Sequence, residues 1–264
     1  MKLKLRSCLE VLPVLGFMLL VSPLSIGQKM PKKMDLYLLI GQSNMAGRGK
    51  ISVDTARNNQ DIWVINGEDG WVPAKDPLHY DKPAAGVGPG LAFAEAIHAN
   101  NPKKTIGLIP CAVGGSGIDD WLPGKKHDQT GIYAYDAMLA RVRMAKRKGT
   151  IKGILWHQGE SDSSPQKSSL YEEKLSAFFA KLRKEIGARN TPLILGTLGD
   201  FYVTKQPEAE KINQILKDYA DNNKNVFIVT SAGLTDLGDK THFNTESARE
   251  LGKRYAGKMI EIDK

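Results

Sequence analysis

The chain has 264 residues, of which 41% are hydrophobic and 25% charged, and its formal net charge is +8. This composition is typical of a globular α/β domain and excludes a low-complexity or repeat protein. The basic residues are scattered over predicted helix faces, as in residues 141–149 and 181–189, without interleaved aromatic residues. This pattern favours solvated helix surfaces over a nucleic-acid partner, although attraction to anionic polymers stays open.

The first 27 residues have the pattern of a secretory signal peptide. Three basic residues precede an apolar stretch over residues 11–21, and the small residues Ser25 and Gly27 precede the expected cleavage before Gln28. Cleavage removes three cations and one anion, which lowers the formal charge from +8 to +6. An uncleaved anchor is the alternative. We otherwise expect an exported protein, periplasmic or secreted, with one domain over residues 28–264 and no stable membrane anchor, because no other run approaches about 20 apolar residues.

Short β-branched apolar runs alternate with longer helical patterns after the signal peptide. Such alternation predicts a parallel sheet with helices on both faces. The expected strands are residues 35–40, 105–110, 153–157, 193–198 and 226–230. The expected helices are residues 90–100, 132–148, 169–186, 207–222 and 245–260.

Two segments interrupt this alternation. Residues 61–74 contain two apolar runs around "NGEDG", which predicts a hairpin lying over the sheet. Residues 75–90 are rich in proline and glycine and predict a long surface loop that contacts substrate. Cys111 follows an expected strand and, with Cys8 lost in the signal peptide, has no disulfide partner, so it should pack as a small hydrophobic residue.

Polar, glycine-containing peptides follow the expected strands at one edge of the sheet, where open parallel sheets bind ligands. They are "GQSNM" at 41–45, "CAVGGSGIDDW" at 111–121, "WHQGESD" at 156–162 and "DLGDKTHFN" at 236–244. A serine needs a histidine that accepts its proton and a carboxylate that orients the imidazole. Ser43, His242 and Asp239 could supply this set, with Asp236 as the alternative carboxylate.

An acyl-transfer site also needs donors for the oxyanion. The backbone of Ser43, the glycines Gly114 and Gly115, and the side-chain amide of Gln158 could provide them. Each of these residues also has a purely structural interpretation, as a tight turn or a loop cap. Their joint occurrence at strand ends favours the catalytic one.

The four blocks "GQSNMAGRG", "PCAVGGSGIDDW", "WHQGESD" and "DKTHFN" resemble the SGNH hydrolase superfamily. The chain is most similar to its sialate O-acetylesterase-like branch, which includes the acetylxylan esterases of carbohydrate esterase family 6, from about residue 36 to residue 255. The resemblance implies a three-layer α/β/α sandwich with a five-stranded parallel sheet in the flavodoxin-like order 2-1-3-4-5.

The resemblance also implies the roles of single residues. Ser43 corresponds to the nucleophile, His242 to the general base and acid, and Asp239 to the residue that orients the histidine. Gly115, with Gly114 as a substitute, corresponds to the oxyanion-hole glycine. Gln158 stands where the wider superfamily has asparagine, and the serine block reads Gly-Gln-Ser-Asn instead of Gly-Asp-Ser-Leu; both departures are normal for this branch.

Several other residues have competing interpretations. Glu160 should support the site from behind, or replace Asp239 in orienting His242; a glycosidase pair with Asp162 is the less favoured alternative.

Trp71, Trp121 and Tyr80 could stack on a sugar ring, or pack in the core. The remaining histidines lack metal-ligand spacing, His157 is expected to be buried beneath a helix, and no metal or cofactor is expected.

The predicted function is an exported serine esterase that removes O-acetyl groups from carbohydrate, with acetylated xylan or a related plant polysaccharide favoured as the substrate. A sialate O-acetylesterase is the first alternative. A lipid-directed esterase and a non-catalytic carbohydrate-binding protein of the same fold are the others. The oligomeric state is left open.

Overall fold

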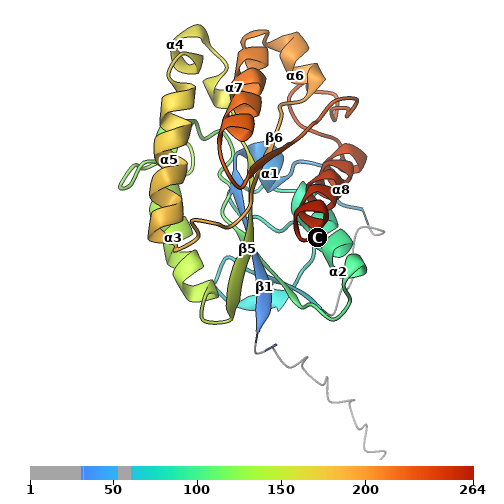
Figure 1. Cartoon of the computed structure of the whole chain (residues 1–264). Helices are drawn as coiled ribbons and strands as arrows, with labels where there is room; N and C mark the ends of the chain where they lie inside the picture. The colour runs from blue at the N-terminus through green and yellow to red at the C-terminus, as the bar shows by residue number, and fades with distance from the viewer. Residues whose placement is uncertain (1–30, 32, 53–60) are drawn as a thin grey trace, which may run out of the picture.

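The computed structural model of the chain describes residue 31 and residues 33–52 and 61–264 (Figure 1). The predicted signal peptide, residues 1–27, lies outside these described residues. Within them, none of the helices combines the length and the apolar character needed to cross a membrane.

One sheet of seven strands runs through the centre of the domain, in the order β3-β2-β4-β1-β5-β6-β7. All neighbouring strands are parallel except the pair β2 and β3. The five predicted strands correspond to β4-β1-β5-β6-β7, which confirms the expected order 2-1-3-4-5, although the sheet has two more strands than predicted. The strands are β1 Met34–Gly41, β2 Ile62–Ile65, β3 Trp71–Pro73, β4 Ile106–Pro110, β5 Gly149–His157, β6 Leu193–Gly196 and β7 Val226–Val229.

The two additional strands come from the predicted hairpin. β2 and β3 do pair in antiparallel fashion, but the hairpin does not lie over the sheet, so that part of the prediction is wrong. β2 instead pairs with β4 in parallel and extends the sheet at that side. The reason is that β4 would otherwise present unpaired backbone groups at the sheet edge, and β2 satisfies them.

The five long predicted helices are all present, with ends shifted by up to three residues. They are α2 Pro89–Asn100, α3 Ala134–Ala145, α5 Tyr171–Glu185, α7 Glu208–Asn222 and α8 Thr245–Ile262. The sequence did not predict the short helices, because one or two turns are too few to show a 3.6-residue period. These are α1 Ser43–Ala46, α4 Pro165–Ser168 and α6 Asp200–Lys205, with the 3₁₀ helices η2 Ile118–Trp121 and η3 Glu160–Asp162.

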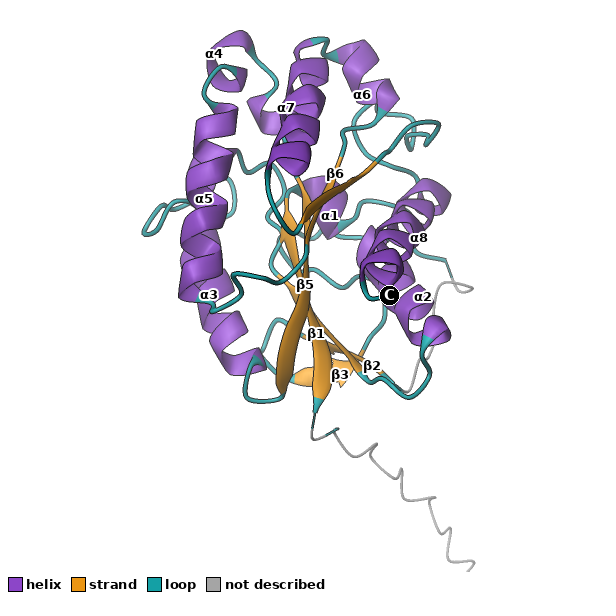
Figure 2. Cartoon of the chain, in the orientation of Figure 1, coloured by secondary structure: helices purple, strands orange, loops and turns teal. Residues whose placement is uncertain are grey.

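Helices cover both faces of the sheet, as the sequence predicted. Figure 2 shows α3 and α5 on one side of the strands and α2 and α8 on the other. Side chains of β1 alternate between these layers: Leu36, Leu38 and Ile40 join the core beneath α3, α5 and α7, whereas Tyr37 and Leu39 join the core beneath α2 and α8. β1 is therefore buried on both faces, and the loop after it lies at the centre of the sheet edge.

Candidate active site

The four polar blocks converge at the carboxyl end of the sheet. In Figure 1, α1 lies at the end of β1 and beside the end of β5. Together with the loops that follow β4 and β7, these segments form a hollow of about 420 Å³. Its lining residues are Gln42, Ser43, Arg48, Lys82, Gly114, Gly115, Glu160, Ser161, Tyr202, Thr241 and His242.

The chain turns sharply at the end of β1 because Gly41 has φ +134° and lies against β5. A Cβ atom on Gly41 would come within 2.0 Å of the His157 carbonyl oxygen, so only glycine fits. The Gln42 N–H then donates to that same oxygen at 2.9 Å, and α1 begins at Ser43. The serine therefore stands at the first position of a helix, where its backbone N–H has no intrahelical acceptor.

Ser43, His242 and Asp239 lie in one hydrogen-bonded line. The Ser43 hydroxyl is 3.0 Å from Nε2 of His242, and Nδ1 of His242 is 2.6 Å from Oδ2 of Asp239. Because the carboxylate can only accept, Nδ1 carries the ring hydrogen and Nε2 is free to accept the serine proton. The structure thus brings together three residues from segments up to 199 positions apart in the relation that nucleophile activation requires.

The Asp239 carboxylate is held in place by backbone donors as well as by the imidazole. Its Oδ1 accepts the N–H groups of Thr241 and His242, at 2.9 and 2.8 Å. Burial raises its pKa, but these bonds and the His242 ring outweigh burial, and the pKa lies below its usual range. The alternative carboxylate, Asp236, accepts from the backbone of Gly238 and Lys240 and stabilises the turn before the histidine.

Ser43 and Gly115, the two residues predicted to bind an oxyanion through their backbone, both line the hollow. Among the described residues, neither Ser43 N–H nor Gly115 N–H has an acceptor. Gly114 cannot substitute for Gly115, because its N–H donates to Oδ2 of Asp81 at 2.7 Å. Gly115 has φ +88°, a conformation that favours glycine and that turns this part of the loop.

A buried ion pair supports this glycine loop from behind. Arg48 and Asp81 are 2.9 Å apart, with side chains 9% and 1% exposed, and Asp81 also binds the Gly114 N–H. A Cβ atom on Gly114 would lie 2.1 Å from Nη2 of Arg48. The sequence did not identify these two charged residues, although the loop that contains Asp81 was expected to contact substrate.

Gln158 lies behind the hollow and not in its lining, which differs from the position that an oxyanion donor was predicted to have. Its side chain is fully buried and does not line the hollow. Its Nε2 donates to Asp162 Oδ2 at 2.6 Å and to Gln42 Oε1 and the Ser116 carbonyl at 3.2 Å. The shortest of these bonds joins the amide to the buried Asp162 carboxylate, and the bond to Gln42 links Gln158 to the residue before Ser43.

The three aromatic residues expected to stack on sugar do not line the hollow. Trp121 is 1% exposed and packs edge-on against Trp156 and Phe178 in the core. Trp71 packs against the same core, and one face of the Tyr80 ring holds the Arg141 guanidinium 4.7 Å from its centre. The aromatic residue that does line the hollow is Tyr202, whose hydroxyl donates to the Glu160 carbonyl.

Glu160 lies beside the nucleophile turn and does not contact His242. Its side chain is 4% exposed, its Oε1 accepts from Nδ2 of Asn44 at 2.5 Å, and its Oε2 has no hydrogen-bond partner in the part of the chain that the structure describes. Burial raises the pKa of Glu160 to about 7, although the Asn44 bond lowers it in part.

His157 is fully buried, as expected, and burial lowers its pKa to about 3, so this imidazole is neutral near pH 7.

The raised pKa of Glu160 gives a testable dependence of stability on pH. A folded-state pKa above the unfolded value of 4.5 means that Glu160 stabilises the fold when protonated, and this stability is lost as pH rises from about 4.5 to about 7. Glu160→Gln removes this ionisation. We expect its unfolding free energy to rise relative to wild type by about 1.4 kcal/mol per pH unit over that window. Urea unfolding at pH 5 and pH 8 measures this, and an equal difference at both pH values would contradict it.

The other described residues form neither a metal site nor a reactive cysteine. In the described part of the chain, no three His, Cys, Asp or Glu side chains are grouped closely enough to hold a metal ion. Cys111 is buried, and burial raises the pKa of its thiol to about 11, so it packs as the small hydrophobic residue predicted.

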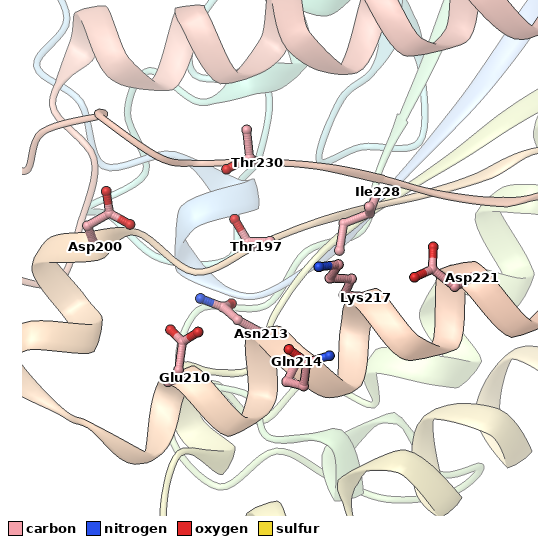
Figure 3. Close-up of a pocket in the computed structure, with 9 residues that line it drawn as sticks. All are labelled: Thr197, Asp200, Glu210, Asn213, Gln214, Lys217, Asp221, Ile228 and Thr230. Atoms are coloured by element: carbon pink, nitrogen blue, oxygen red, sulfur yellow. The ribbon is translucent and has the colours of Figure 1, made fainter.

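A second hollow, of about 430 Å³, lies between α7 and the ends of β6 and β7 (Figure 3). The described residues that line it include the acidic residues Asp200, Glu210 and Asp221 and the basic residue Lys217, but no histidine. Asn213 in its wall binds both the N–H and the carbonyl of Leu198. This hollow lacks a nucleophile and base pair, so the hollow at Ser43 is the candidate active site.

Comparison with known proteins places the chain among carbohydrate esterases. A relative from Arabidopsis thaliana, "Probable carbohydrate esterase At4g34215", is 31% identical over 244 residues, which cover 84% of this chain and 88% of the relative. The crystal structure of that Arabidopsis protein matches with a TM-score of 0.77 over 88% of this chain and 99% of its own.

Two more distant structures share the fold. NanS matches with a TM-score of 0.71 at 15% identity, over 88% of this chain and 98% of its own. XAC1771, a carbohydrate acetylesterase from Xanthomonas citri, matches with a TM-score of 0.65 at 20% identity, over 84% of this chain and 55% of its own. Residues 33–261 match the family described as carbohydrate esterase, sialic acid-specific acetylesterase, and the chain belongs to this family.

Proposed function

We propose that this protein is a serine esterase that removes O-acetyl groups from carbohydrate through an acetyl-enzyme intermediate. The observation that carries the proposal is the line from Ser43 Oγ to His242 Nε2 and from His242 Nδ1 to Asp239. Ser43 and Gly115 line the same hollow, and the backbone N–H of each has no acceptor among the described residues. Membership of the carbohydrate esterase family supports the same reaction class.

In the proposed reaction, Ser43 Oγ attacks the acetyl carbonyl carbon while His242 Nε2 accepts the hydroxyl proton. The backbone N–H groups of Ser43 and Gly115 bind the oxygen that becomes negative. The tetrahedral intermediate collapses as His242 gives its proton to the departing sugar oxygen. Water, deprotonated by His242, then attacks the acetyl-enzyme, and collapse of the second intermediate returns the proton to Ser43 and releases acetate.

The favoured substrate is acetylated xylan or a related plant polysaccharide. The site lies at the surface, since the side chains of His242 and Asp239 are 24% and 38% exposed. Such a site is accessible to an acetyl group on a polymer. O-acetylated sialate is the second candidate, because Lys82 lines the hollow and its ammonium group suits a sugar carboxylate, whereas Arg48 is already paired with Asp81.

Acetate release from acetylated xylan and from O-acetylated sialic acid, measured side by side, tests the substrate. We expect faster release from xylan. Faster release from the sialate would reverse the order of the two candidates, and release from neither would exclude both. A preference for butyrate over acetate esters would support a lipid-directed esterase instead.

Export is part of the same proposal. The basic start, apolar stretch and small residues of the first 27 positions support cleavage before Gln28 and a periplasmic or secreted location. N-terminal sequencing of the protein recovered from the producing cells and from their surroundings tests it. An intact Met1 in all fractions would argue for the uncleaved anchor.

A further inference from the structure

Asn44, the residue after Ser43, makes hydrogen bonds to both peptide groups that flank His242. Its Oδ1 accepts the N–H of Phe243 at 3.0 Å, and its Nδ2 donates to the carbonyl of Thr241 at 2.9 Å. The side chain belongs to α1 and is buried, whereas Thr241 and His242 lie in the partly exposed loop between β7 and α8. Two hydrogen bonds therefore join the nucleophile turn to the loop that carries the histidine.

These two hydrogen bonds fix the loop beside His242, where a displacement would have the largest effect on the reaction rate. The Ser43 hydroxyl and the His242 ring must stay within hydrogen-bond reach, and a displacement of about 1 Å can cost about 10²-fold in rate. Asp239 orients the ring within its own loop, because its Oδ2 contacts Nδ1 of His242 while its Oδ1 accepts the N–H groups of Thr241 and His242. Asp239 thus sets the ring orientation, and Asn44 connects the whole loop to the serine.

Glu160 determines which way the Asn44 amide points. Its Oε1 accepts the second hydrogen of Nδ2, at 2.5 Å, and a flipped amide would bring two acceptor oxygens together. Glu160 is itself held by η3, whose backbone carbonyl at this residue accepts the Tyr202 hydroxyl. The amide has one orientation that satisfies all three of its neighbours.

We propose that Asn44 is a positioning residue that holds His242 against Ser43, with its amide oriented by Glu160. This inference rests on the proposed function, since it assumes that Ser43 and His242 carry the reaction. It assigns a chemical reason for asparagine directly after the serine: only a side chain with one acceptor and two donors can satisfy these three contacts.

The first test compares Asn44→Ala with Asn213→Ala on an aryl acetate. Asn213 is a matched control, because it binds the N–H and carbonyl of Leu198 in a hollow without the reacting residues. We expect Asn44→Ala to lower kcat about 10²-fold with KM changed less than about threefold. Asn213→Ala should lower the melting temperature but keep kcat within about twofold. Equal kcat in the two variants would overturn the proposal.

The second test introduces a negative charge at position 44. Asn44→Asp keeps the acceptor for Phe243 but places a carboxylate against Glu160 and the Thr241 carbonyl, so kcat should fall at least as far. Adding Glu160→Gln supplies an amide that can donate to the new carboxylate, and we expect it to restore kcat about tenfold over Asn44→Asp alone. Loss of activity that is simply additive in the double variant would contradict the assigned orientation.

A third readout does not depend on esterase activity. Hydrogen exchange at residues 241–244 should be faster in Asn44→Ala than in wild type and unchanged in Asn213→Ala. A wild-type protein that releases no acetate, with this exchange pattern intact, would refute the proposed function and leave the contact role standing. Unchanged exchange in Asn44→Ala would refute the positioning role in an active enzyme.

Discussion

Replacing Ser43 with alanine should lower the hydrolysis of an aryl acetate by at least about 10³-fold, because the reaction then loses its covalent intermediate. The fold should be retained, since alanine fits the first turn of α1 and, among the described residues, the Ser43 hydroxyl bonds to His242 alone. The residual rate should come from the two backbone N–H groups and from substrate binding.

The matched control is Ser169→Ala. Its hydroxyl donates to the Gln166 carbonyl in an exposed position between α4 and α5, so its loss should leave the rate unchanged. Melting temperatures of the two variants should lie close to that of wild type. Equal rates for Ser43→Ala and wild type would remove Ser43 as the nucleophile and favour the non-catalytic carbohydrate-binding alternative.

The sequence predicted the fold well, because the apolar residues of each long helix or strand follow a pattern that is typical of that element. Continuous apolar runs such as β1 identify strands buried on both faces, and the switch-point rule gives the end of the sheet where polar loops meet. The hairpin of β2 and β3 was placed wrongly, since a local pattern does not tell whether a hairpin covers a face or extends an edge. Edge pairing depends on which strand is left unpaired, and that is a property of the whole sheet.

The candidate site likewise contains residues whose roles could be predicted from the sequence and residues whose roles could not. Ser43, His242 and Asp239 could be assigned because nucleophilic catalysis limits which residue types can act together. Gln158 could not be placed, since the direction of a buried amide depends on its competing partners, here Asp162 and Tyr171. The stacking role of Trp121 failed for a related reason: sequence does not distinguish a core tryptophan from one in a binding site.

Asp239→Asn should be the second most damaging substitution, with a loss of about 10³- to 10⁴-fold in kcat. Asparagine keeps the size of the side chain, but its NH₂ group can face Nδ1 and favour the tautomer with hydrogen on Nε2, which cannot accept the Ser43 proton. Its carbonyl oxygen can still accept from Thr241 and His242, so the turn should keep its shape. The loss in kcat would therefore reflect the changed tautomer of the His242 imidazole more than a loss of loop stability.

Two further variants decide which carboxylate orients His242. Asp236→Asn changes a carboxylate that accepts hydrogen bonds from the turn backbone, and Glu160→Gln changes one that binds Asn44. Each should lose less than about tenfold in kcat. A loss in Glu160→Gln that equals or exceeds the loss in Asp239→Asn would transfer the orienting role to Glu160. The short contact of 2.6 Å between His242 Nδ1 and Asp239, with no Glu160 contact to that ring, is the reason to expect the opposite.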